Sequence, residues 1–348
     1  MTNSGSSANL IMIGALKEYF EWNNEDEIIV SVVGFPTTTS SIIQNNLSPI
    51  FVDISWSDLN WDYSEIESKI TRRTRALFFS PVLGNSGQFG RLIELCEKYN
   101  LKLVLDNCDS LGSKWNDLYL NEYAVASSCS FYPAHHITTM EGGMVTSNIE
   151  QITTIARSLA WWGRGCYCVG RQNLLPNGTC KNRFDTWIPE CDFKVDHKYL
   201  FDRVGYNLKP LDLQGAIGLS QLGKFNVIDN LRRQNKESID LIFSKVSGLR
   251  KVEEAPNSQT SWFGAPYIAD TVELKLELVK YLEKNRIQTR NYFAGNILMQ
   301  PGYSKFGDWR KYPNASEVLG KVFFVGVSPT ITKPMIDYVA KIVNDFDK

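Results

Sequence analysis

The chain has 348 residues, enough for one large domain and one smaller domain that each bury a core. Hydrophobic residues make up 43% and charged residues 22%, and the formal net charge is −1, so no basic excess favours a nucleic acid or an anionic membrane as partner. No apolar run is long enough to span a bilayer, and the polar N-terminus lacks the basic start of a signal peptide. We therefore expect a cytoplasmic protein.

Strand and helix patterns alternate along the first two thirds of the chain. Short apolar runs predict strands over Glu27–Val32, Pro49–Ile54, Ala76–Pro81, Leu101–Asn107, Ala126–Tyr132 and Gly143–Ser147. Amphipathic segments predict helices over Ala8–Phe20, Arg91–Tyr99 and Ile149–Leu159. This alternation favours a mostly parallel sheet with helices on both faces.

The segment from 163 to 197 has a different character. It is rich in Cys, Gly, Asn, Pro and aromatic residues without any period, and a loop of this length inside a compact domain is usually functional. A helical segment is predicted next, over Leu211–Phe243, with an apolar stripe formed by Leu213, Ala216, Ile217, Leu219 and Leu222. We expect a large domain over residues 1–243 and a smaller α/β domain over residues 244–348.

The chain opens on NSGSSAN, residues 3–9, at the start of the first predicted helix. Small residues let backbone N–H groups approach an anion closely, and a helix N-terminus adds partial positive charge. The segment is therefore a candidate phosphate site, although serine-rich N-caps are also common without a ligand.

An aspartate follows the fourth predicted strand. Asp106 lies in LVLDNCD, residues 103–109, and the carboxyl end of a parallel strand is where α/β folds place their ligands. Its carboxylate could keep a pyridinium nitrogen protonated, so that the ring acts as an electron sink. The simpler interpretation is a turn or helix cap.

Two adjacent histidines follow the fifth predicted strand. The segment SCSFYPAHH, residues 128–136, presents His135 and His136, and EGG at 141–143 begins the next strand; His197 is the third histidine of the chain. Neighbouring histidines make a poor chelate and no carboxylate is spaced as a third ligand. Acid–base chemistry is therefore favoured over a metal site.

Together these motifs resemble the DegT/DnrJ/EryC1/StrS family of sugar aminotransferases. The resemblance runs in order through NSGSSAN, Asp106, the turn at Ser130, EGG and GYNLK at residues 205–209. It implies the PLP-dependent transferase fold of type I: an α/β protein whose large domain holds a mixed, mostly parallel seven-stranded sheet, followed by a smaller C-terminal α/β domain. It also implies a homodimer with active sites at the interface.

His135 stands where the family pattern has the lysine that binds pyridoxal 5′-phosphate (PLP) as a Schiff base. This substitution resembles the 3-dehydrase subgroup, which acts on nucleotide-linked 4-keto-6-deoxy sugars. Because imidazole cannot form that link, the resemblance implies non-covalent pyridoxamine 5′-phosphate (PMP), with His135 as the catalytic base. The expected substrate is CDP-4-keto-6-deoxy-D-glucose, which loses its C3 hydroxyl on a route to the 3,6-dideoxy sugars of lipopolysaccharide O-antigen.

The resemblance also assigns binding residues. Those expected at the cofactor are Ser6, Ser7, Phe35, Asp106, Asp109, Ser130 and Asn207. Phe35 would stack on the pyridine ring, although core packing explains it equally well, and Asn207 would reach the cofactor phosphate of the partner subunit. Arg290 and Asn296 are expected at the substrate.

Seven cysteines in a chain without a signal peptide favour free thiols or a metal site over disulfides. Buried thiols are the simpler interpretation, and they suit Cys96 and Cys129. The resemblance implies a [2Fe–2S] cluster that relays electrons from an iron–sulfur flavin reductase. Its ligands would be Cys108, Cys166, Cys168 and Cys180, with Cys191 as the alternative to the last because that spacing is longer than in the family pattern.

Two other functions stay open. One is a cluster-free dehydratase acting on GDP-4-keto-6-deoxymannose, which shares the histidine but does not need four cysteines. The other is a non-catalytic paralogue, because the family normally carries a substantial segment before NSGSSAN and we expect this chain to lack it. An ordinary aminotransferase is disfavoured, since no lysine occupies the turn.

Overall fold

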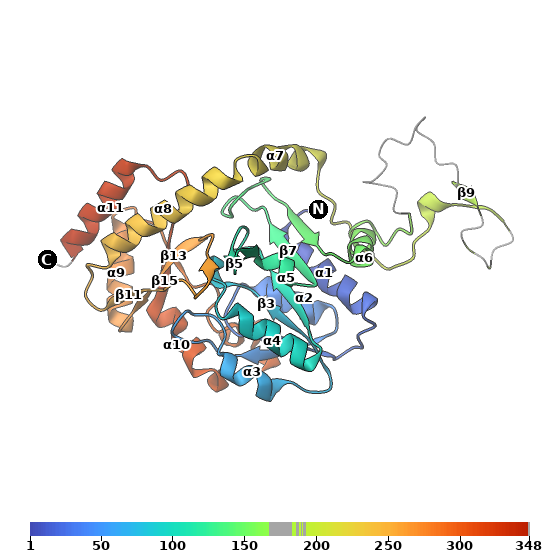
Figure 1. Cartoon of the computed structure of the whole chain (residues 1–348), viewed down its shortest axis with the longest axis horizontal. Helices are drawn as coiled ribbons and strands as arrows, with labels where there is room; N and C mark the ends of the chain where they lie inside the picture. The colour runs from blue at the N-terminus through green and yellow to red at the C-terminus, as the bar shows by residue number, and fades with distance from the viewer. Residues whose placement is uncertain (167–182, 186–187, 189, 191–192, 347–348) are drawn as a thin grey trace.

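A computed structural model describes residues 1–166, 183–185, 188, 190 and 193–346, with a large mixed sheet in the N-terminal part and a smaller sheet in the C-terminal part (Figure 1). The strands of the large sheet are β1 (Glu27–Ser31), β2 (Ser48–Val52), β3 (Thr74–Phe79), β4 (Lys102–Asp106), β7 (Ala126–Ser130) and β8 (Gly143–Thr146). Their order is β2-β1-β3-β4-β7-β8, and every neighbouring pair is parallel except β7 with β8. All six predicted strands are confirmed, with small shifts at their ends.

One further backbone segment touches this sheet at the β8 edge. Thr2 and Gly143 form an antiparallel bridge, in which the Thr2 N–H donates to the Gly143 carbonyl at 2.8 Å and the Gly143 N–H donates to the Thr2 carbonyl at 3.0 Å. The family resemblance implied seven strands, and the described residues form six strands and this bridge. The segment at Thr2 is not a seventh strand because it pairs with only one residue of β8.

Helices cover both faces of the large sheet because successive strand side chains point to opposite sides. Ile28 and Phe78 belong to the core shared with α1 (Gly5–Tyr19), α2 (Pro36–Gln44) and α6 (Glu150–Ala160). Ile29 and Phe79 belong to the core shared with α3 (Tyr63–Lys69), α4 (Phe89–Tyr99) and α5 (Leu120–Tyr123). The predicted strand–helix alternation thus yields a sheet buried on both sides.

The second sheet lies in the C-terminal part, and its strands are antiparallel. It comprises β11 (Leu249–Lys251), β13 (Gly264–Ala269), β15 (Val322–Gly326) and β14 (Thr289–Asn291), in that order. Its core includes side chains of α8 (Phe225–Phe243), α9 (Val272–Lys284) and α11 (Lys333–Phe346). In contrast, α10 (Pro313–Lys321) contributes to the core that contains Ile28 and Phe78 of the large sheet. The helical segment predicted over Leu211–Phe243 is two helices, α7 (Asp212–Leu222) and α8, which are separated at Gly223 and Lys224.

Short strands complete the described structure. A three-stranded sheet contains β12 (Ser258–Gln259), β5 (Lys114–Trp115) and β6 (Leu118–Tyr119), and a hairpin pairs β9 (Phe184–Asp185) with β10 (Val195–Asp196). Figure 1 shows β9 on an arm that lies apart from both larger sheets. Within the described residues, no helix has the length and apolarity needed to cross a membrane.

Candidate active site

A cavity of about 810 Å³ lies at the carboxyl ends of β3, β4 and β7. The α1 N-terminus and the segment after β1 complete its wall on the large-sheet side, and Arg290, Phe293 and Val327 close it from the C-terminal part. Parallel sheets place ligands at this edge, because loops and helix N-termini converge there. The cavity therefore gathers groups that are distant in the sequence.

The α1 N-terminus reaches the cavity through Ser6, whereas Ser7 points elsewhere. Ser4 caps the helix, since its hydroxyl accepts from the Ser7 N–H at 3.1 Å, and the Ser7 hydroxyl donates to Asn3 at 2.6 Å. Ser6 lines the cavity and Ser7 is not part of the wall. This helix end can still receive a phosphate, with its backbone N–H groups and Ser6 as the donors.

Gly5 brings the start of α1 against the turn after β7. A Cβ atom on Gly5 would lie 2.5 Å from Ser130 Cβ, closer than real Cβ contacts come, and 3.1 Å from Cys108 Sγ. Ser130 is buried and lines the same cavity. The close approach places the helix N-terminus beside Ser130. Both could therefore contact the same phosphate group.

Asp106 is a buried carboxylate fixed by neighbouring side chains. Its Oδ2 atom accepts from the Asn9 amide at 2.7 Å and from the Thr38 hydroxyl at 2.6 Å. In the described part of the chain no ion pair neutralises it, although it is only 4% exposed and lines the cavity. Buried carboxylates normally have a cationic or strongly donating partner, and a pyridinium N–H would supply one here.

His135 presents its imidazole to the cavity as a neutral base. Its Nδ1 atom is 3.4 Å from Asp109 Oδ1, without the geometry of a hydrogen bond, and its ring centroid is 5.1 Å from that of Phe263. Burial, with a contribution from Arg232, lowers the pKa of His135 to about 4 against the opposing effect of Asp106. Burial and the Asp106 charge raise the pKa of Asp109 to about 8. At neutral pH the site therefore holds an unprotonated imidazole that can accept a proton.

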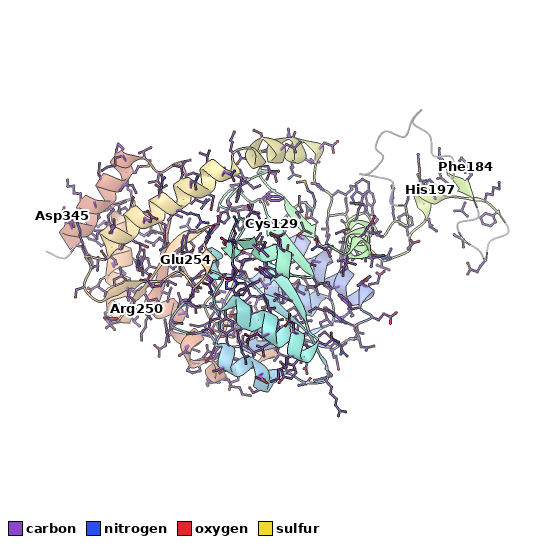
Figure 2. The ribbon with its side chains drawn as sticks, in the orientation of Figure 1. Cys129, Phe184, His197, Arg250, Glu254 and Asp345 are labelled. Carbon is purple, nitrogen blue, oxygen red and sulfur yellow. The ribbon has the colours of Figure 1, made fainter. Side chains whose placement is uncertain are left out.

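The other two histidines do not join this site. His136 is buried, its Nε2 atom lies 2.9 Å from the Ser261 carbonyl, and burial lowers its pKa to about 3. His197 lies with Phe184 on the arm, well away from Cys129 of β7 (Figure 2). Of the three histidines, His135 is the one that lines the cavity.

The remaining predicted residues divide into two groups. Phe35, 57% exposed at the start of α2, and Arg290 of β14 both line the cavity. Asn296 does not: it is fully buried, its amide donates to the Trp309 carbonyl and the Ser316 hydroxyl at 3.1 Å each, and its Oδ1 atom accepts from the Leu298 N–H. All of its side-chain polar atoms serve the fold, so the structure does not bring it to the cavity. Asn207 is exposed beside Trp161, and its contact with a partner subunit stays a prediction.

The cysteines predicted to bind iron are only partly described. Cys108 lines the cavity, and burial raises the pKa of its thiol well above the ordinary range. Cys166 is half-buried, while Cys168, Cys180 and Cys191 lie outside the described residues. The residues that the structure describes contain no group of three or more metal-binding side chains.

Three residues of the site were not predicted from the sequence. Arg232 and Phe263 line the cavity, and Thr38 donates to Asp106. Arg232 is buried on α8 and contributes to the cavity wall. A signal was present, because Arg232 and Lys236 occupy the same helical stripe as the buried residues Ile239 and Phe243. Charged residues at core positions of a helix indicate a specific polar role.

The fold and this site define a class of protein, the PLP-dependent enzymes of the aminotransferase fold. Residues 1–344 match the DegT/DnrJ/EryC1/StrS aminotransferase family, and the chain belongs to that family. It is 38% identical over 355 residues to dTDP-4-dehydro-2,6-dideoxy-D-glucose 3-dehydratase of Saccharopolyspora spinosa, covering 99% of this chain and 76% of the relative. It is 35% identical to lipopolysaccharide biosynthesis protein RfbH of Salmonella typhimurium, covering 99% of this chain and 80% of the relative.

A solved structure supports the same assignment. GDP-4-keto-6-deoxy-D-mannose-3-dehydratase of E. coli, with bound hydrated PLP, superimposes with a TM-score of 0.83 at 29% identity, covering 98% of this chain and 86% of that one. The fold expected from the sequence is therefore confirmed, and the chain is an enzyme whose similar relatives are named sugar 3-dehydratases.

Proposed function

We propose that this enzyme catalyses the PMP-dependent C3 dehydration of a nucleotide-linked 4-keto-6-deoxyhexose, with CDP-4-keto-6-deoxy-D-glucose as the substrate. The observation that carries the proposal is His135, which stands at the Schiff-base position and presents a neutral imidazole to the cavity. The names of the similar 3-dehydratases support the reaction class. The likeness to a lipopolysaccharide biosynthesis protein supports a role in O-antigen synthesis.

The cavity wall provides a place for each part of the cofactor. The α1 N-terminus with Ser6, next to Ser130, would hold the phosphate, Asp106 would face the pyridine nitrogen, and Phe35 would cover the ring. When bound, the cofactor supplies an amine for the sugar ketone and an electron sink. The protein's own contribution would be to fix these groups and to hold the Asp106 carboxyl group against the ring nitrogen.

Proton transfer is the task of His135. The neutral imidazole would accept a proton from the cofactor C4′ carbon and could return one to the C3 hydroxyl as it leaves. Asp109, whose raised pKa keeps its carboxyl group protonated at neutral pH, stands beside Nδ1 and would donate to the cofactor's phenolic oxygen. Arg290, on the opposite wall, would meet the anionic nucleotide sugar.

We include in this proposal a [2Fe–2S] cluster held by Cys108, Cys166, Cys168 and Cys180, with Cys191 as the alternative fourth ligand, and an iron–sulfur flavin reductase as electron donor. The place of Cys108 on the cavity wall supports it, because an electron path to the substrate would be short. Anaerobic purification with iron and sulfide analysis tests it. Serine at Cys108, Cys166 or Cys168 should abolish iron binding, and normal iron in all these variants would remove the cluster from the proposal.

A homodimer is also part of the proposal, and α7 is the surface that supports it. Leu213, Leu219 and Leu222 of this helix are 59%, 75% and 60% exposed in the single chain. A helix with exposed apolar side chains on several sides is expected to pack against a further surface. The family resemblance implies that Asn207 of one copy reaches the cofactor phosphate of its partner.

The deciding experiment is borohydride treatment combined with a sugar-nucleotide panel. The native protein should carry no pyridoxyl group on any lysine after reduction. With a two-electron donor present, mass spectrometry should show the CDP-linked 4-keto sugar lighter by one oxygen atom, because the loss of water is followed by reduction. A pyridoxyl group fixed to a lysine of the native protein would refute the assignment of His135. His135→Lys is the matched control, because it should create that covalent link and favour transamination.

One alternative retains support from the comparisons. The TM-score of 0.83 to GDP-4-keto-6-deoxy-D-mannose-3-dehydratase favours a GDP sugar as a second candidate substrate. A colourless, iron-free protein that dehydrates only the GDP-linked sugar would establish it. A protein that binds no cofactor at all would instead be the non-catalytic paralogue.

A further inference from the structure

Arg232 is a buried cation directly behind His135. It is 4% exposed, and its guanidinium donates to main-chain carbonyl groups of two segments. Nη2 contacts the carbonyls of His135 at 3.0 Å and Ala134 at 3.4 Å, and Nη1 contacts those of Phe263 at 3.2 Å and Trp262 at 3.5 Å. Within the described residues it forms no ion pair with a carboxylate.

The two segments that Arg232 joins meet at the imidazole. One carries His135, and the other carries Phe263, whose ring centroid is 5.1 Å from the imidazole centroid. A single planar guanidinium therefore fixes the backbone of the base and the backbone of the ring that packs on it. His136 strengthens the same junction through its 2.9 Å contact with the Ser261 carbonyl.

The charge of Arg232 also acts on His135, because it lowers the pKa of the imidazole. The titratable and charged groups around the His135 imidazole are Asp109 and Asp106 from the β4 side, Tyr132 and His136 from its own turn, and Arg232 from α8. Burial is the main cause of the lowered pKa of His135, and Arg232 lowers it further while Asp106 raises it. A buried cation without a carboxylate partner is costly, so packing alone would be better served by an apolar residue.

We propose that Arg232 is the positioning residue of the dehydration: it holds the His135 turn against the segment that carries Phe263. Its positive charge also favours the neutral form of the imidazole. The inference rests on the function proposed for His135. It adds a residue on α8, far from the cofactor motifs in sequence, that controls the geometry and the protonation state of the base.

The first test needs no substrate, because it follows the imidazole itself. The chain has three histidines, so ¹³Cε1-histidine NMR can be assigned with His136→Gln and His197→Gln variants. Arg232→Gln should raise the titration midpoint of His135 by about one pH unit. Arg232→Lys keeps the charge and should leave the midpoint near the native value. An unchanged midpoint in folded Arg232→Gln would overturn the electrostatic part of the proposal.

The second test separates geometry from charge by kinetics. Arg232→Lys cannot bridge both segments, so kcat should fall by about 100-fold while KM stays within about threefold. The matched control is Arg233→Gln, since Arg233 is adjacent, only partly buried and paired with Asp229 at 3.1 Å. Native kcat in Arg232→Lys, or an equal loss in the control, would overturn the positioning role.

Two other experimental outcomes also decide the proposal. If Arg232→Gln does not fold, as judged by its melting curve, Arg232→Lys alone decides through its kcat and KM. If the native enzyme dehydrates no sugar nucleotide, the proposed function fails, while the NMR titration still supports or refutes the effect of Arg232 on His135.

Discussion

At the residue scale, Asp106 and His135 are held in opposite ways. Asp106 is fixed through its side chain, because Asn9 and Thr38 both donate to one carboxylate oxygen. His135 has no such side-chain hydrogen bond, and its backbone is held instead, by Arg232. A rigid carboxylate suits a constant charge beside a ring, whereas an imidazole without a strong side-chain partner is free to take up a proton.

This difference predicts the effect of Asp106→Asn. The amide has nearly the same shape but no charge, so it cannot keep the pyridine nitrogen protonated. We expect turnover to fall by about 100-fold or more, with cofactor affinity much less affected. Steady-state kinetics and cofactor fluorescence titration measure the two effects. Thr38→Val is the control, because it removes one hydrogen bond to the carboxylate and keeps its charge; near-normal turnover in Asp106→Asn would exclude the role.

His136 makes a separate prediction about stability and pH. Its Nε2–H donates to the Ser261 carbonyl, and its buried Nδ1 atom has no partner, so protonation is costly in the native state. The native pKa of about 3 lies below the unfolded value of 6.5. The stabilising effect of the neutral ring is therefore complete above pH 6.5 and is lost progressively as the pH falls.

The comparison with His136→Gln isolates this effect. The glutamine amide can still donate to the Ser261 carbonyl but does not titrate. For each pH unit below about 6.5, the native protein should lose about 1.4 kcal/mol more free energy of unfolding than the variant. Urea unfolding at several pH values measures the difference, and parallel pH profiles for the two proteins would contradict the prediction.

The sequence predicted some site residues and not others for a physical reason. Ser6, Asp106 and His135 lie within a few residues of a strand or helix end, so their place at the carboxyl edge of the sheet follows from local patterns. The helical stripe of α8 indicates that Arg232 is buried, but not that it contacts the turn after β7, because that contact is long-range. Asn296 looked like a binding residue, but the fold uses its whole side chain as a cap and a cross-link.

At the element scale, the position of α1 depends on Gly5. The absence of a side chain lets the helix N-terminus lie against Ser130, and a Cβ atom at 2.5 Å from Ser130 Cβ would push the two apart. We expect Gly5→Ala to destabilise the protein by about 1–3 kcal/mol and to weaken cofactor binding, because the phosphate donors would be displaced. Melting curves with and without cofactor measure both effects.

A second glycine provides the control. Gly302 lies in a turn away from α7, has no positive φ and has nothing within 4 Å of its hypothetical Cβ atom. Gly302→Ala should therefore be close to neutral, because the methyl group meets no neighbour. If Gly5→Ala were as stable as Gly302→Ala and bound cofactor normally, the close approach of α1 would not matter to the site.

At the scale of the whole molecule, the predicted pattern and the observed burial disagree at α7. Periodicity predicted an apolar stripe on this helix, and the helix itself is present. The single chain nevertheless buries only Gln214 of α7. The helix, which precedes α8 in the chain, lies at the outer edge of the molecule (Figure 1). Apolar periodicity indicates that a surface will be covered, but it does not tell whether the cover comes from the same chain.

The proposed homodimer predicts that a charge on α7 will separate the subunits. Leu219 is 75% exposed on α7, and Leu241 is 72% exposed on α8, so they are matched in type and exposure. Leu219→Asp would bury a carboxylate in an apolar interface and should weaken self-association strongly, whereas Leu241→Asp should leave it unchanged. Sedimentation equilibrium measures both. Since Asn207 is expected to reach the partner's cofactor, the Leu219→Asp protein should also lose cofactor affinity on dilution. A monomeric native protein, or equal effects of the two substitutions, would show that α7 is not the interface.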